Sequence, residues 1–292
     1  MIVQGTQAVD RAFSVLRAVA SKNKGGITLL ELVNEISLKR PTIHRLVLAL
    51  MANGMVYWDP ETHRYFVGLG CYALGIVAAD RYGLRQAGSN AVARLARVCG
   101  DAALLTIRSN MEAVCVARED GDYPLQSRVL MPGDRAPLGV HGGGLAILSA
   151  LTDREVEECL EANIGVIAKK YPAFSESIIR AEVNAARKRG YAINPGLAIA
   201  GSWAISTAIH SANGDVFGAL TIAAVEPRMQ KKRERKLAKL LLAEKKLVEE
   251  QIKKSEMLQI ENLYRRLPIA REVAISGPGE MRDRYRELNT AS

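Results

Sequence analysis

The chain has 292 residues, a hydrophobic fraction of 48% and a formal net charge of +9. This apolar content supports folded cores and excludes global disorder, and the length suits two domains followed by a tail. No apolar run is long enough to span a membrane, and the N-terminus lacks the pattern of a secretory signal, so we expect a cytoplasmic protein with no membrane partner.

The four cysteines and four histidines are dispersed, without a CxxC pair or the spacing of metal ligands. We therefore expect isolated thiols rather than a metal or redox site, and no cofactor. The charge is uneven: residues 1–70 carry eight basic side chains against five acidic ones, residues 71–225 balance, and residues 226–271 carry fourteen against seven. Both basic ends could attract the phosphates of DNA.

The N-terminal region predicts three helices. The first covers residues 9–20, and its apolar residues fall on one face, which is made of Val9, Ala12, Phe13, Leu16, Val19 and Ala20. The second begins at Thr28, because Thr28 and Glu31 match a capping box. After a turn at 37–39, the third runs from Arg40-Pro41, where proline is tolerated in the first turn, to a stop at Asn53-Gly54.

The third helix has an apolar face of Ile43, Leu46, Val47 and Leu50, and Arg45 points away from it. Two short apolar runs, 55–58 and 64–67, then bracket the turn at 59–63 and predict a hairpin. Helix, helix, tight turn, helix and hairpin is the order of a winged helix-turn-helix, in which the last helix enters the major groove of DNA. A three-helix bundle without a DNA function is the alternative.

The candidate DNA-contacting residues lie on the second and third helices and on the wing. They are Thr28, Lys39, Arg40, Pro41, Thr42, His44, Arg45, His63 and Arg64. One winged helix reads too few bases to select a genomic site, so we expect a homo-oligomer, a dimer or a tetramer, on double-stranded operator DNA.

The run from Ile27 to Gly70 resembles the N-terminal domain of the IclR family of bacterial transcription regulators. The matching positions are Ser37, Thr42, Arg45, Leu46, Val47, Leu50, Gly54, Tyr65, Val67 and Gly68. Pro41 stands where the family usually has serine. The resemblance implies a winged helix-turn-helix domain over 1–70, a linker helix over 71–84, an effector domain over 85–254 and a C-terminal extension over 255–292.

The middle region predicts an α+β domain. After a helix over 71–100 with a joint at Tyr82-Gly83, apolar runs at 103–107 and 113–117 predict strands around a turn at Asn110. Two amphipathic helices follow, near 153–162 and 175–189. The final strands, 203–210 and 216–224, flank the hairpin turn Ala212-Asn213-Gly214-Asp215.

A glycine-rich loop, 139–144, precedes a predicted helix at 145–151. Such a loop could offer backbone N–H groups to an anion. It also mimics the oxyanion loop of esterases, but the GxSxG nucleophile motif is missing, so we do not expect an enzyme. Two interpretations of the loop remain. It is a tight connection that needs positive φ angles, or it is the wall of a small-molecule pocket, where glycine leaves room for a ligand.

The resemblance extends to the GAF-like effector domain of the IclR family through Pro137-Leu138, the glycines of the loop and Gly190-Tyr191-Ala192. It implies an effector site, and its candidate residues are Leu138, His141, Gly142, Gly143, Gly144, Asn194, Ala204, Thr221 and Ala223. Gly139, Leu145 and Asn194 stand where relatives commonly have histidine, lysine and aspartate. The pocket is therefore expected to be less polar, and its effector aromatic or weakly polar.

The segment 228–266 predicts one long amphipathic helix, whose apolar positions are Leu237, Leu240, Leu241, Leu247, Val248 and Ile252. Three roles remain open for this helix: it packs against the second domain, it mediates oligomerisation, or it makes a supplementary contact with DNA. Taken together, the sequence predicts a DNA-binding transcription regulator controlled by a small effector. The alternatives are a non-specific architectural DNA binder and an enzyme with an incidental helix-turn-helix.

Overall fold

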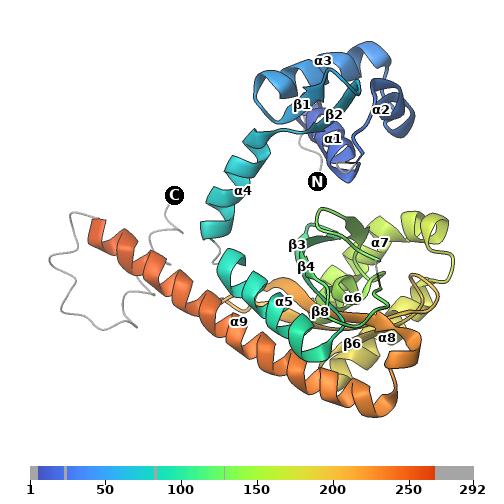
Figure 1. The fold of residues 1–292 in the computed structure, drawn as a ribbon, viewed down its shortest axis with the longest axis vertical. Helices are drawn as coiled ribbons and strands as arrows, with labels where there is room; N and C mark the ends of the chain where they lie inside the picture. Colours follow the sequence, from blue (N-terminus) through green and yellow to red (C-terminus); the bar gives the residue numbers. More distant parts are fainter. Residues whose placement is uncertain (1–5, 23–24, 82–83, 128, 267–292) are drawn as a thin grey trace.

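The computed structural model describes residues 6–22, 25–81, 84–127 and 129–266. Helix α4 leads from an N-terminal domain to a larger α+β domain (Figure 1). The N-terminal domain and linker comprise α1 (Gln7–Ser21), α2 (Leu29–Glu35), α3 (Arg40–Ala52), β1 (Val56–Asp59), β2 (Arg64–Val67) and α4 (Leu69–Arg81). The predicted joint at Tyr82-Gly83 lies outside the described residues.

Local signals set the ends of the N-terminal helices. The Thr28 side chain accepts a hydrogen bond from the Glu31 N–H (3.2 Å), and the Glu31 carboxylate accepts one from the Thr28 N–H (2.7 Å), so the capping box that starts α2 is confirmed. At the end of α3, Gly54 has a φ of +68°, which glycine adopts readily. Strands β1 and β2 pair antiparallel, with Val56 opposite Val67, and complete the winged helix-turn-helix.

The predicted apolar face of α1 was partly wrong. Val15 and Val19 are the buried side chains of this helix, whereas Val9 and Phe13 are 53% and 54% exposed. The helix packs against α3 and β2 through the side that carries Val15 and Val19, because these two residues belong to the core of the domain. Val9 and Phe13 therefore lie on an open flank of α1.

The second domain is built on a six-stranded antiparallel sheet with the strand order β5-β4-β3-β8-β7-β6. Its strands are β3 (Ala102–Ser109), β4 (Glu112–Glu119), β5 (Arg135–Pro137), β6 (Ala192–Pro195), β7 (Ser202–His210) and β8 (Val216–Val225). Its helices are α5 (Leu84–Cys99), α6 (Gly142–Ala150), α7 (Asp153–Lys170), α8 (Glu176–Arg189), the 3-10 turn η1 (Glu226–Arg228) and α9 (Lys231–Arg266). Within the described residues, none of these helices combines the length and the apolar character needed to cross a bilayer.

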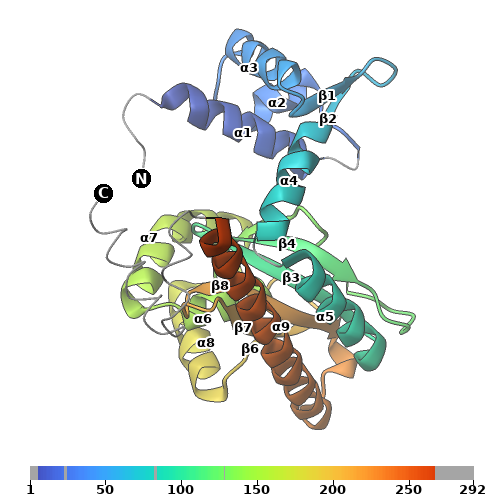
Figure 2. The same ribbon diagram turned by 90° about the vertical axis from the view of Figure 1, so that its left-hand side faces the viewer.

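The sheet is covered by helices on both faces, and the predicted α+β class of this domain is confirmed (Figures 1 and 2). Helices α5 and α9 lie side by side on one face and share a core with β3, β7 and β8. Helices α6, α7 and α8 form a second core on the other face. The two cores bury most of the apolar strand residues, and this burial is the main driving force for folding the domain.

Helix α9 packs against the sheet, which agrees with the predicted role of a packing helix. Leu237, Leu241 and Val248 are buried there, and the Arg94 guanidinium on α5 donates to both carboxylate oxygens of Glu244 on α9. The apolar pattern of the helix predicted that Leu247 would be buried, but its side chain is exposed. The helix continues without a break beyond residue 254.

The glycine-rich segment differs from the prediction, because α6 begins at Gly142 rather than at Leu145. The Leu145 N–H donates to the His141 carbonyl (2.8 Å), so residues 142–144 form the first helical turn. Of residues 139–144, all of them described, only Gly139 has a positive φ. Glycine is a poor helix former, so close packing of this turn against the sheet overrides local propensity.

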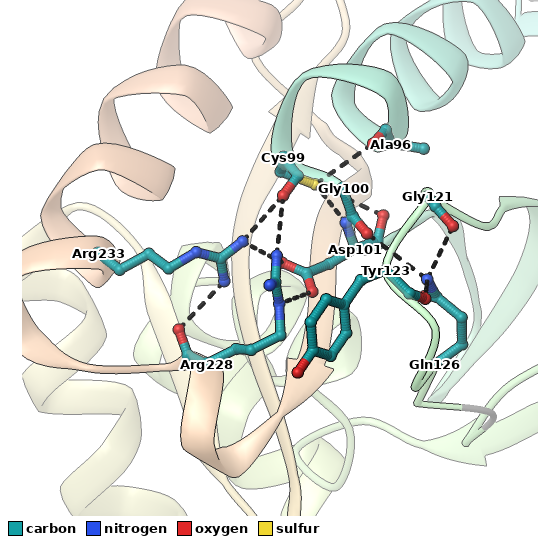
Figure 3. A network of polar contacts seen from close by, with 9 residues as sticks. All are labelled: Ala96, Cys99, Gly100, Asp101, Gly121, Tyr123, Gln126, Arg228 and Arg233. Carbon is teal, nitrogen blue, oxygen red and sulfur yellow. Dashed lines mark hydrogen bonds and ion pairs between the residues drawn. The ribbon is translucent and has the colours of Figure 1, made fainter.

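A buried ionic cluster joins Asp101, the residue before β3, to Arg228 in η1 and Arg233 at the start of α9 (Figure 3). The Asp101 side chain is 1% exposed and accepts from the Arg228 Nε (2.6 Å) and from the Arg233 guanidinium. The Arg228 guanidinium also lies 3.7 Å from the centre of the Tyr123 ring. The Tyr123 N–H donates to the Gly100 carbonyl (2.9 Å), which attaches the loop after β4 to the same cluster. Within that loop, the Gln126 amide donates to the backbone oxygens of Gly121 and Tyr123.

Candidate functional site

Helix α3 presents a basic face to solvent. Ile43 and Val47 are buried beneath the helix, while Pro41, His44 and Arg45 are exposed on the outside. Lys39 and Arg40 are exposed at the start of the helix, and the stretch 39–58 contains no acidic residue. The helix macrodipole adds partial positive charge at this end of α3. This surface has the charge and the shape to meet a phosphate backbone and a major groove.

The other predicted DNA-contacting residues are placed differently. Thr28 caps α2, and Arg64 donates to the Gly26 carbonyl (3.0 Å) and to Glu31 (3.3 Å), so both already bond within the domain. Thr42 is half-buried. His63 has a φ of +55° at the tip of the wing, with its ring 5.7 Å from that of Trp58. The structure therefore brings five of the nine candidates together, at residues 39–41 and 44–45.

A small cavity of about 30 Å³ lies between the sheet and the first turn of α6. The lining is mostly apolar and small. It consists of Leu104, Thr106, Arg118, Ser127, Val129, Leu130, His141, Gly142, Gly143, Asn194, Ala198, Ser202, Ala204, Thr221 and Ala223. A concave, mainly apolar site with a few polar groups is typical of small-molecule binding.

Seven of the nine predicted effector residues line this cavity: His141, Gly142, Gly143, Asn194, Ala204, Thr221 and Ala223. Leu138 and Gly144 do not. Leu138 is buried in the core beneath α6, α7 and α8. A β-carbon on Gly144 would point toward Ala113 and the backbone near Pro137, away from the cavity.

Glycine is needed at 142 and 143 because α6 packs more closely against the sheet than the sequence predicted. A β-carbon on Gly142 would lie 2.6 Å from the Ser206 hydroxyl oxygen, and one on Gly143 would lie 2.8 Å from the Thr106 hydroxyl oxygen. Neighbouring side chains therefore occupy the room that glycine leaves, and these two residues let α6 approach the sheet. Their backbones still border the cavity.

The polar groups predicted for the pocket are largely committed within the protein. The Asn194 amide donates to the Val140 carbonyl (2.5 Å) and accepts from the Leu197 N–H (3.1 Å). The Thr221 and Ser206 hydroxyls lie 2.9 Å apart in a hydrogen bond. Burial lowers the pKa of His141 to about 4, so its imidazole is neutral near pH 7.

The structure adds lining residues that the sequence had not indicated. Arg118 enters from β4, Ser127, Val129 and Leu130 from the loop after it, and Ser202 from β7. The loop residues carry no motif, so no sequence signal identifies them. Arg118 directly follows the apolar run 113–117 of β4, and its side chain is only 3% exposed.

Comparison with known proteins gives the family. The model of the IclR helix-turn-helix domain matches residues 8–60, and that of the bacterial transcriptional regulator IclR C-terminal domain matches residues 76–248. The repressor AllR of Salmonella paratyphi A is 25% identical over 232 residues, which span 79% of this chain and 84% of AllR. AllR of Escherichia coli K12 is 24% identical over 234 residues, with the same shares covered.

Solved structures show the same fold. An IclR transcriptional regulator from Alicyclobacillus acidocaldarius superposes with a TM-score of 0.71 at 19% identity, covering 84% of this chain and 98% of that one. An IclR homolog from Microbacterium hydrocarbonoxydans, solved in complex with 4-hydroxybenzoate, gives 0.68 at 18% identity, covering 84% and 99%. With a family model over more than half of its length, the chain belongs to the IclR family of bacterial transcriptional regulators.

Proposed function

We propose that this regulator binds operator DNA through paired N-terminal domains and that a small effector, bound in the cavity beside α6, changes its affinity for the operator. The observation that carries the proposal is the basic face of α3, whose opposite side is buried in a complete winged helix-turn-helix. An effector acts only through different affinities for two states of the protein. The Microbacterium homolog, which was solved in complex with 4-hydroxybenzoate, supports the binding of a small molecule.

Replacing Arg45 by alanine is expected to weaken operator binding by about 1–3 kcal/mol, because a groove contact is lost. The operator would first be selected with the wild-type protein from a random-sequence DNA library, and affinity then measured by fluorescence anisotropy. Arg154→Ala is the matched control, since Arg154 is exposed on α7, far along the chain from the helix-turn-helix. Unchanged affinity of a folded Arg45→Ala protein would show that α3 does not read the operator.

We also propose that the protein is a homo-oligomer, a dimer or a tetramer. Apolar side chains exposed on two helices support this: Val9 and Phe13 on α1, and Leu69, Tyr72, Leu74 and Val77 on α4. Exposed apolar side chains in such number mark an interaction surface. A second copy is the fitting occupant, since two winged helices are needed to read two half-sites.

Sedimentation at micromolar concentration is expected to show at least a dimer. Val77→Asp should shift the protein toward the monomer, because Val77 is 71% exposed in one chain and a charge there would oppose burial between two chains. Val166→Asp, on the exposed side of α7, serves as the control for the same change at another exposed valine. A wild-type monomer, with and without operator DNA, would contradict the proposal.

A further inference from the structure

Helix α9 turns several of its acidic side chains toward the domain. The Glu234 carboxylate accepts a hydrogen bond from the Tyr191 hydroxyl (3.0 Å), and the Glu249 carboxylate accepts one from the His210 backbone N–H (2.9 Å). Glu244 is buried against α5. These carboxylates therefore bond within the domain and do not neutralise the outer side of the helix.

The outer side of α9 carries a row of exposed basic side chains, which we call the basic stripe. At 100° per residue, its members lie within about 60° of one line along the helix, opposite the buried Leu241 and Val248. Over residues 231–254, where every side chain is described, Glu250 is the one exposed carboxylate. The basic stripe consists of Lys232, Arg235, Lys236, Lys239, Lys246, Lys253 and Lys254.

No carboxylate in the described part of the chain pairs with the basic stripe. The ion pairs of α9 among described residues use Arg233, Glu244, Lys245 and Glu249, which lie outside the stripe. Figure 2 shows α9 in front of the sheet, with no other described helix or strand over its outer side. Surfaces of small domains usually intersperse both signs of charge, so the stripe is an unusual concentration of positive charge.

The length of the basic stripe suits an extended polyanion. Its lysines at 232, 239, 246 and 253 recur every seven residues on one continuous helix, so at 1.5 Å per residue they span about 32 Å, with about 10 Å between neighbours. A small anion would contact only one or two of them. A turn of duplex DNA is about 34 Å long and carries one negative charge per about 1.7 Å of its axis. Duplex DNA therefore matches both the length and the charge of the stripe.

Two other occupants fit the basic stripe less well. The same stripe on a second copy of the chain would repel it, because both surfaces are positive. A helix that lies on a membrane inserts an apolar face between the lipids, whereas the apolar face of α9 is already buried against the sheet through Leu237, Leu241 and Val248. A nucleic-acid backbone requires no apolar face, so it remains the fitting partner.

We propose that the basic stripe of α9 binds the phosphate backbone of duplex DNA without sequence preference, as a second DNA contact in addition to α3. The contact goes beyond the proposed function, which needs only the helix-turn-helix and the cavity. Lysine predominates in the stripe, and its compact ammonium group attracts a phosphate as a point charge without reading a base. Lys253 and Lys254 extend the stripe past residue 248, where the match to the family's C-terminal domain ends.

The test measures how strongly salt weakens DNA binding by the full-length protein. A stripe variant that combines Lys232→Gln, Lys239→Gln and Lys246→Gln would be compared with the wild type on a scrambled duplex, by fluorescence anisotropy between about 50 and 200 mM salt. The slope of log K against log salt is expected to become shallower by about 2–3, since each lost phosphate contact removes about 0.9. At the lowest salt concentration, the affinity should fall at least about tenfold.

The matched control combines Arg154→Gln, Lys169→Gln and Lys170→Gln, which removes the same charge from exposed positions on α7. Its slope should change by less than about 1. Circular dichroism would verify that both variants are folded. If the stripe variant binds DNA like this control, or like the wild type, the proposal is overturned. Lost binding to phosphatidylserine vesicles with unchanged DNA binding would likewise overturn it and assign the stripe to a lipid surface.

Comparing the operator with the scrambled duplex separates this contact from that of α3. The stripe variant should weaken both duplexes by about the same factor, because phosphate contacts do not depend on sequence. Arg45→Ala should instead weaken the operator more than the scrambled duplex. Loss confined to the operator in the stripe variant would contradict a sequence-independent contact. An Arg45→Ala protein with unchanged operator affinity would contradict the proposed function and leave the result for the stripe standing.

Discussion

Asp101→Ala is expected to destabilise the C-terminal domain by about 3–5 kcal/mol, because removing one partner of a buried ion pair leaves the others uncompensated. Asp101 accepts from Arg228 and Arg233, which belong to the turn before α9 and to α9 itself. Without the carboxylate, two guanidinium groups would remain close together beside the Cys99 carbonyl. The start of α9 would then lose its attachment to the sheet.

Urea denaturation would measure this effect domain by domain, since Trp203 lies on β7 and Trp58 lies on the wing. In a Trp58→Phe background, the fluorescence of Trp203 reports the C-terminal domain alone. Glu158→Ala is the matched control, because Glu158 pairs with the exposed Arg154 on the surface of α7 and should change stability by less than about 1 kcal/mol. A similar effect of both substitutions would show that the Asp101 cluster does not stabilise the domain.

The sequence predicted the N-terminal domain well because its signals are local. A capping box, a proline in the first turn of α3 and the Asn53-Gly54 stop each act within a few residues. Which side of α1 is buried depends instead on how the three helices pack. Periodicity alone therefore could not show that Phe13 would remain exposed.

In the second domain, the sequence predicted the strands but not the details of the cavity. Glycine at 142–144 indicated a loop, because the intrinsic helix propensity of glycine is low, whereas the fold uses these residues to bring α6 close to β3 and β7. The bulge at Val116, between the pairs Ala117–Leu105 and Cys115–Thr106, had no sequence signal. The prediction of a loop at 142–144 was wrong because contacts between segments far apart in the chain determine the start of α6.

Gly143→Val is expected to abolish effector binding and to destabilise the C-terminal domain by about 3 kcal/mol, near the upper end of the cost of overpacking a core. The sequence predicted that glycine in this segment leaves room for a ligand. The structure instead places a β-carbon at this position 3.1 Å from the Thr106 Cβ and 3.2 Å from the Thr221 hydroxyl oxygen. The Thr106 Cβ is fixed to its strand, so rotating the hydroxyl cannot relieve the contact. The first turn of α6 must move away from the sheet.

Gly165→Val provides the control, since Gly165 lies on the exposed side of α7 with open space where a β-carbon would be added, and valine is a slightly better helix former than glycine. Its stability should change by less than about 0.5 kcal/mol. Operator affinity without effector should stay close to wild type in Gly143→Val while the C-terminal domain remains folded, because the N-terminal domain has its own core. A Gly143→Val protein with wild-type stability and a normal ligand response would show that α6 can shift without disturbing the cavity.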